Sequence, residues 1–167
     1  TFVQAVSALM TISSEETIAA EDAAELIAKY ELTELPVVIF TGDLELYAET
    51  VSKLEALGSY IGDDLVLTAK LNPPYWDLET KEVIGLVSVT YLTDDSCEDC
   101  YNVNIHKTVL TNYGVYIAEE TTIDISSDEG KELLEQYNIT KVPTVIVSQD
   151  LAYYSSILKI WEYVGTV

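Results

Sequence analysis

The chain has 167 residues, of which 49% are hydrophobic and 22% charged, a composition typical of a globular protein. Acidic residues outnumber basic ones by 29 to 8, and the net charge of −21 repels phosphate backbones and anionic lipid heads. We therefore expect the protein to bind neither nucleic acid nor, directly, an anionic membrane surface. No apolar run approaches the roughly 18–20 residues of a membrane-spanning helix, and no signal peptide is visible. We expect an extracytoplasmic protein or the excised soluble domain of a membrane-anchored one.

The first part of the chain predicts alternating helices and strands. Apolar residues at helical spacing indicate a helix, whereas β-branched runs bounded by Pro or Gly indicate strands. The expected elements are a helix end running into a strand (1–12), a helix (20–30), a strand (35–40), a turn (41–43), a short returning strand (44–47) and a helix (49–60).

The middle of the chain predicts β structure. Residues 65–71 alternate like a strand, and Asn72-Pro73-Pro74 ends it. Residues 77–82 are typical of a hairpin turn, and residues 83–92 form a long apolar strand. We expect residues 63–81 to connect two units, because no flexible linker rich in Gly or Ser is present.

The only two cysteines follow the long strand, spaced as Cys97-Glu98-Asp99-Cys100. A polar turn precedes them, and a helix is predicted from about residue 98 to 112. At a helix N-terminus, free backbone N–H groups and the helix dipole lower the pKa of the first thiol. The remaining elements are a helix (130–137), a strand (142–147), a turn (148–150), a strand (151–154) and a closing helix (155–164).

The two halves of the chain are related by an internal repeat. An offset of 107 residues (143 − 36) aligns Pro36 with Pro143 and gives ten identities in 23 ungapped positions. At this offset Cys97 has no counterpart, because the corresponding position (97 − 107 = −10) lies before Thr1. The first repeat therefore lacks its opening strand and any CxxC pair.

The CxxC after a strand, followed by Val142-Pro143 and a β-branched run, resembles the thioredoxin-like superfamily. The tandem arrangement resembles the glutaredoxin-like protein disulfide oxidoreductases. The resemblance implies an α/β fold with one complete thioredoxin-like unit at 82–167 and a partial N-terminal repeat of the same unit at 1–62. It also implies cis peptide bonds before Pro143 and Pro36.

The resemblance further implies a thiol–disulfide oxidoreductase with no cofactor, whose partners are protein or peptide thiols and disulfides. Cys97 would be the exposed attacking thiol and Cys100 the buried resolving thiol one helical turn later. Val142 and Pro143 would contact the substrate peptide. Pro36 would be the matching residue of a half-site without cysteines.

Two other interpretations of the cysteine pair stay open. One is a stable structural disulfide in a redox-inactive thioredoxin-like module that binds peptides or assembles a complex. The other is a metal site formed with His106, the only histidine, which would point some 120° away from Cys100 on a shared helix. The residues do not disclose the electron donor, the direction of exchange or the oligomeric state.

Overall fold

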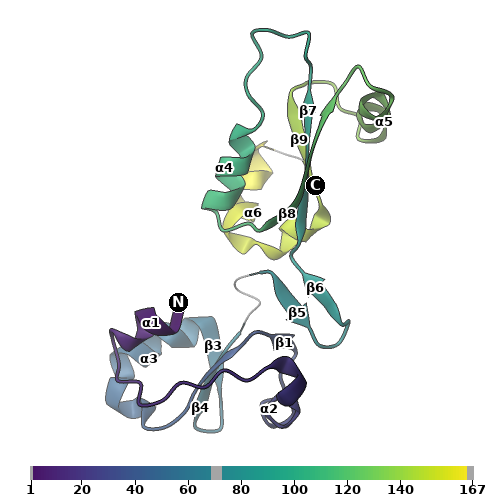
Figure 1. Cartoon of the computed structure of the whole chain (residues 1–167). Helices are drawn as coiled ribbons and strands as arrows, with labels where there is room; N and C mark the ends of the chain where they lie inside the picture. Colours follow the sequence, from purple (N-terminus) through teal and green to yellow (C-terminus); the bar gives the residue numbers. More distant parts are fainter. Residues whose placement is uncertain (1, 69–72, 165–167) are drawn as a thin grey trace. The chain divides into compact units, whose positions relative to one another are not determined.

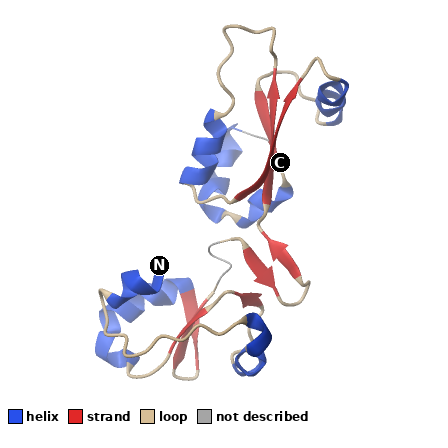
Figure 2. Ribbon diagram, in the orientation of Figure 1, coloured by secondary structure: helices blue, strands red, loops and turns tan. Residues whose placement is uncertain are grey.

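A computed structural model describes residues 2–68 and 73–164 and shows a mixed α/β protein with short helices and three small sheets (Figures 1 and 2). The chain divides into two compact units, Thr1–Leu71 with Tyr75–Glu82 and Asn72–Pro74 with Val83–Val167. Each unit has its own cluster of buried apolar side chains. Within the described ranges no helix is long and apolar enough to cross a bilayer.

The first unit combines short helices with a three-stranded sheet of order β2-β4-β3, in which β4 is antiparallel to both neighbours. Residues 64–67, expected in the connecting segment, are thus the central strand of this unit. Its elements are α1 (Phe2–Ser7), the 3-10 helix η1 (Ala20–Asp22), α2 (Ala24–Lys29), β1 (Glu34–Leu35), β2 (Val38–Phe40), η2 (Leu44–Tyr47), α3 (Ala48–Leu54), η3 (Glu55–Leu57), β3 (Gly58–Ile61) and β4 (Asp64–Leu67).

Two elements of this unit differ from the expected ones. The strand expected at the end of residues 1–12 is absent: α1 ends at Ser7, and β1 is the first strand among the described residues. The helix expected over 49–60 ends early, and the chain turns into β3 at Gly58. A Cβ at Gly58 would lie 2.0 Å from the Val66 carbonyl oxygen, so only glycine permits this close approach of β3 to β4.

The chain reaches the second unit through a β-hairpin. β5 (Tyr75–Asp77) pairs antiparallel with β1, and the third sheet has the order β1-β5-β6, with β6 spanning Glu82–Ile84. The Asp77 carboxylate accepts hydrogen bonds from the N–H groups of Glu79 and Thr80, which closes the turn expected at 77–82. The strand expected over 65–71 is described only as far as Leu67 of β4, and residues 69–72 lie outside the described ranges.

The second unit is built on β7, which is the middle strand of the sheet β8-β7-β9 (Figure 1). β7 is parallel to β8 and antiparallel to β9. Figure 1 shows α4 and α6 on one side of this sheet and α5 on the other. The elements are β7 (Val87–Thr93), α4 (Ile105–Asn112), β8 (Ile117–Asp124), α5 (Asp128–Gln136), β9 (Thr144–Val147), η5 (Gln149–Tyr153) and α6 (Ser155–Val164).

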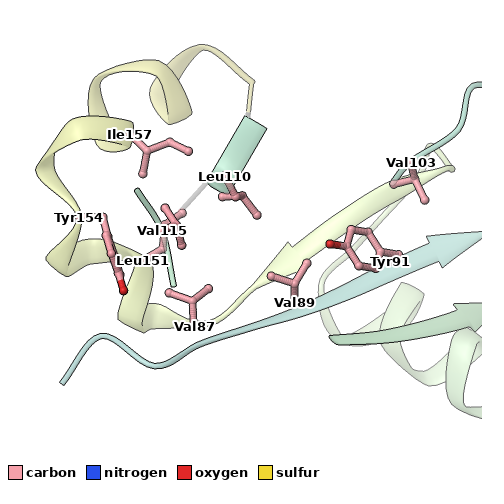
Figure 3. Packing of buried hydrophobic residues seen from close by; sticks show 9 residues of the cluster. All are labelled: Val87, Val89, Tyr91, Val103, Leu110, Val115, Leu151, Tyr154 and Ile157. Carbon is pink, nitrogen blue, oxygen red and sulfur yellow. The ribbon is translucent and has the colours of Figure 1, made fainter. Parts of the chain in front are cut away.

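The core of the second unit lies between β7 and the helices α4 and α6 (Figure 3). Val87, Val89 and Tyr91 alternate along β7 and project to the same face, where all three are buried. The side chains that complete the cluster are Val103, Leu110, Val115, Leu151, Tyr154 and Ile157. The long strand expected over 83–92 is interrupted at Gly85, whose φ of +89° is a conformation that favours glycine.

Residues 24–54 and 131–161, which the sequence repeat relates, follow the same course in the structure. Helix α2 or α5 is followed by a residue with positive φ, Glu31 or Asn138, and these two residues are 107 apart (138 − 31). Strand β2 or β9, the 3-10 helix η2 or η5 and the helix α3 or α6 then follow, and the first repeat has the two-residue strand β1 in addition. Both X–Pro bonds expected to be cis, Leu35–Pro36 and Val142–Pro143, are cis, as is Pro73–Pro74.

The returning strands expected at 44–47 and 151–154 are wrong in both repeats. The chain forms the 3-10 helices η2 and η5 there, each of which buries one leucine, Leu44 or Leu151. A single inward leucine per turn is what a 3-10 helix supplies, whereas a strand would bury alternate residues. The same departure at both positions shows that the repeat extends to the local fold.

Tyr154 ties the start of the central strand to the helical side of the second unit. Its buried hydroxyl donates to the Gly85 carbonyl oxygen at 2.6 Å and accepts from the Tyr116 N–H at 3.1 Å. Tyr154→Phe leaves both backbone groups without this partner, so we expect a loss of about 1–3 kcal/mol in the free energy of unfolding. Urea unfolding measures it, and Tyr153→Phe, at a side chain 48% exposed, is the matched control with an expected change within about 0.5 kcal/mol.

Candidate active site

Three chain segments meet at one end of the second unit's sheet, where β7 and β8 finish and β9 begins. At the carboxyl end of β7, Thr93 pairs with Asp124, the last residue of β8. Because β9 is antiparallel, its first residue, Thr144, pairs with Leu92 at the same end. Three segments therefore lie together at this end of the sheet: the loop that follows Thr93, the turn that follows Asp124 and the Val142–Pro143 pair. Figure 1 shows the loop between β7 and α4 beyond this end of the sheet.

The cysteines lie in that loop and are joined to each other. Cys97 and Cys100 form a disulfide with a Cα–Cα distance of 5.5 Å, and both residues are half-buried. The loop consists of turns, and α4 begins only at Ile105. The expectation that Cys97 starts a helix beginning near residue 98 is wrong, and Cys100 is half-buried instead of buried as expected.

Local hydrogen bonds explain why the helix does not extend back to the cysteines. The Asp94 carboxylate accepts from the N–H of Ser96 at 3.0 Å, and the Asp94 carbonyl oxygen accepts from the N–H of Cys97 at 3.0 Å. Farther along, the Asn102 side chain accepts from the N–H of Asn104 at 3.0 Å. Short polar side chains that bond to nearby backbone groups favour turns over helix. The helix dipole therefore does not act directly on Cys97.

Tyr101 connects the cysteine loop to the proline loop. Its hydroxyl donates to the Pro143 carbonyl oxygen at 3.0 Å and lies 3.3 Å from Nε2 of His106. The rings of Tyr101 and His106 meet edge to face with centroids 6.0 Å apart. The residue that directly follows Cys100 is thus bonded to one of the two residues expected to contact substrate. The structure brings the cysteine loop and Pro143 together through this side chain.

Asp124 fixes the other side of the cysteine loop. Its carboxylate accepts from the Ser126 hydroxyl at 2.5 Å, from the Ser126 N–H at 2.9 Å and from the Asp95 N–H at 2.7 Å. The bond from the Ser126 hydroxyl, followed by those from the Asp95 and Ser126 N–H groups, lowers the pKa of the Asp124 carboxyl. The ionised side chain joins the end of β8 to the start of the loop, two residues before Cys97.

A buried tyrosine, Tyr91, lies near the carboxyl end of β7, which finishes at Thr93. Tyr91 is 2% exposed, and its hydroxyl donates to Glu120 of β8 at 2.9 Å. Lys107 of α4 donates to the other oxygen of the Glu120 carboxylate at 2.5 Å. The bond from Lys107 and then that from Tyr91 lower the pKa of Glu120, and burial together with the Glu120 contact raises the pKa of Tyr91 to about 12. These three residues join β7, β8 and α4 through one polar network.

The raised pKa of Tyr91 predicts a specific loss of stability in alkali. The folded protein holds this proton more tightly than the unfolded chain, whose tyrosines have a pKa of about 10, so stability falls as pH rises from about 10 to about 12. Tyr91→Phe has no such proton. We expect denaturant unfolding across this range to show a drop in the free energy of unfolding larger for the native protein than for Tyr91→Phe by about 2 kcal/mol. Equal slopes for the two proteins would contradict the burial of the Tyr91 hydroxyl.

The metal interpretation of the cysteine pair gains no geometric support. Among the described residues no group of three or more His, Cys, Asp or Glu side chains is arranged to hold a metal ion. Both cysteine sulfurs are used in the disulfide, and His106 contacts Tyr101.

Among the residues at this end of the sheet, Tyr101 and Asp124 were not singled out from the sequence. The position of Tyr101 next to Cys100 was the one available signal for it.

A comparison of the chain with protein-family models, with curated proteins and with solved structures gives no match. The assignment of function therefore depends on the geometry of the cysteine loop and the proline loop at the end of this sheet.

Proposed function

We propose that the protein is a thiol–disulfide oxidoreductase in which Cys97 and Cys100 are the redox pair and Val142 and Pro143 bind the substrate peptide. The observation that carries the proposal is the hydrogen bond from the Tyr101 hydroxyl to the Pro143 carbonyl oxygen, which holds the cysteine loop against the proline loop. A half-exposed disulfide at CxxC spacing lies in that loop. The expected partners are protein or peptide thiols and disulfides.

The order of elements supports a thioredoxin-like origin for this site. In the second unit a central strand carries the CxxC loop at its carboxyl end, a helix leads to a parallel strand, and a second helix leads to an antiparallel strand opened by proline. This is the arrangement that the resemblance implies for its first three strands. The fourth expected strand is replaced by η5. We propose the same origin for the first unit through the repeat.

The exchange itself needs two successive thiol–disulfide steps. In the reduced protein the Cys97 thiolate attacks one sulfur of a substrate disulfide, forms a mixed disulfide and releases one substrate thiolate. The Cys100 thiolate then attacks Cys97, re-forms the Cys97–Cys100 disulfide and releases the second substrate thiolate. Two electrons pass from the protein dithiol to the substrate, and the same steps in reverse oxidise a substrate dithiol.

Catalysed reduction of a peptide disulfide by excess dithiothreitol tests this proposal. We expect the rate to rise in proportion to protein concentration and to return to the uncatalysed rate when the cysteines of the protein have been alkylated. A rate independent of protein concentration, in either direction of exchange, would refute an oxidoreductase. That result would favour the alternative, a redox-inactive module with a structural disulfide. The absence of a helix N-terminus at Cys97 also favours this alternative.

The link through Tyr101 predicts a moderate loss of activity on removal of one oxygen atom. Tyr101→Phe keeps the ring but breaks the bond to the Pro143 carbonyl oxygen, so the two loops are no longer held in register. We expect kcat/KM for the peptide disulfide to fall by about 3–10-fold, which corresponds to a hydrogen bond of about 0.5–1.5 kcal/mol. Tyr113→Phe, at a tyrosine 37% exposed, is the matched control and should leave kcat/KM unchanged.

A further inference from the structure

β9 has one edge that no described strand pairs with, since it is the terminal strand of the sheet β8-β7-β9. The Ser148 N–H donates to the Ser88 carbonyl oxygen at 2.9 Å, on the β7 side. Successive residues of a strand direct their backbone groups to opposite edges. Thr144 and Ile146 therefore face β7, and the backbone groups of Val145 and Val147 face the other edge.

In the first unit the corresponding edge is filled. The Thr68 N–H donates to the Leu57 carbonyl oxygen at 3.0 Å, so Thr68 faces β3. By the same alternation Leu65 and Leu67 of β4 face β2, where they pair with Phe40 and Val38. At the repeat offset of 107 (145 − 38), Val38 and Phe40 correspond to Val145 and Val147. The unpaired edge of β9 is therefore the edge that β4 covers on β2.

The burial of side chains at the two edges differs in the same sense. In the first unit Leu65 and Leu67 are 0% and 5% exposed and belong to one buried cluster with Leu54. Val38, Phe40 and Leu54 correspond to three residues of the second unit, which we call the β9 margin: Val145, Val147 and Trp161. All three are only partly buried and pack against the outside of the core of the second unit. Phe40 and Leu54 are buried beside β4, whereas their counterparts Val147 and Trp161 are only partly buried; Val38 and Val145 are partly buried in both units.

We propose that the outer edge of β9 is a docking site for an antiparallel strand with the chemistry of β4, an acidic residue followed by three apolar ones. The repeat relates β4 to no described residue of the second unit, and the occupant is a peptide strand of a partner protein with this pattern. The added strand bonds to the backbone of Val145 and Val147, and its apolar side chains cover the β9 margin. The sheet then has the order β8-β7-β9 followed by the added strand.

The test adds a synthetic peptide with the sequence of residues 57–68 to the full chain. We expect amide exchange at Val145 and Val147 to slow about tenfold at a peptide concentration about ten times Kd, because exchange then occurs only from the free fraction. Thr144 and Ile146, already bonded to β7, should change less than about twofold. In a Trp76→Phe background, Trp161 is the only tryptophan, and its emission should shift to shorter wavelength as the β9 margin is covered.

Two modified peptides serve as controls. A peptide with serine at both Leu65 and Leu67 lacks the covering side chains, and one with N-methyl groups at the same two residues lacks the N–H groups that would face β9. Neither should protect Val145 or Val147. The proposal is overturned if the unmodified peptide leaves all four amides unchanged up to its solubility limit, or protects all four equally. It is also overturned if Val145 and Val147 are already protected in a concentration-dependent dimer, because a second copy then holds the edge. None of these outcomes bears on the activity of the cysteines.

Discussion

Replacement of either Cys97 or Cys100 with serine is expected to abolish catalysed exchange, with the rate falling to that of the uncatalysed reaction. One thiol is able to form a mixed disulfide, but turnover requires the second thiol to release the substrate. The measurement is the rate of peptide disulfide reduction at fixed dithiothreitol. Ser96→Ala, which changes the neighbouring exposed residue, should retain most of the activity.

The two serine variants should differ in what they trap. If Cys97 attacks, as the resemblance implies, Cys100→Ser accumulates a covalent complex with a disulfide substrate, and Cys97→Ser accumulates little. Both cysteines are half-buried, so the expected difference follows from the assigned roles and not from the burial of one residue. Equal trapping by the two variants, measured by mass under non-reducing conditions, would refute the assigned roles and leave a symmetrical redox pair.

Gly130→Ala is expected to destabilise the second unit by about 1–3 kcal/mol or more and to lower exchange activity with it. A Cβ at this buried glycine would lie 2.3 Å from the Asp124 carbonyl oxygen and 2.8 Å from the Ile125 Cα. Both are backbone atoms, so relief requires a shift of the turn that follows β8. The same turn holds the Asp95 N–H through the Asp124 carboxylate, and the cysteine loop shifts with it.

Glu129→Ala is the matched control, because it places the same methyl group on the adjacent, exposed residue of α5. It removes one acid from the first turn of the helix and should cost about 0.3–1 kcal/mol with no change in activity. Denaturant unfolding and the peptide reduction rate measure both effects. A Gly130→Ala protein as stable and as active as Glu129→Ala would contradict the close packing of α5 on this turn.

The large elements of the fold were predictable from the sequence because their patterns are local. Helix α6 begins and ends where the pattern placed it, and the proline-opened strands β2 and β9 were expected from a short β-branched run. The offset of 107 predicted equivalent structure in the two units, including positions where the type of element was wrong. A repeat preserves local geometry even where propensity rules misassign it.

The candidate site was predictable only in its residues and not in its geometry. Cys97, Cys100 and Pro143 carry recognisable patterns, but the turn that replaces the first part of α4 arises from side-chain bonds of Asp94 and Asn102. Such bonds compete with helix through specific local geometry that residue spacing does not record. The bond from Tyr101 to Pro143 joins residues 42 apart, and the contact of Asp95 with Asp124 joins residues 29 apart. Only tertiary packing brings these groups together.

A count of free thiols in the folded protein tests the redox function of the Cys97–Cys100 disulfide most directly. The protein is treated with a mild dithiol at neutral pH, without denaturant, and thiols are titrated after the reductant is removed. A redox-active pair predicts two new thiols per chain, which disappear again when a small disulfide is added. A disulfide that yields no thiols under these conditions and is reduced only after the protein unfolds would contradict it.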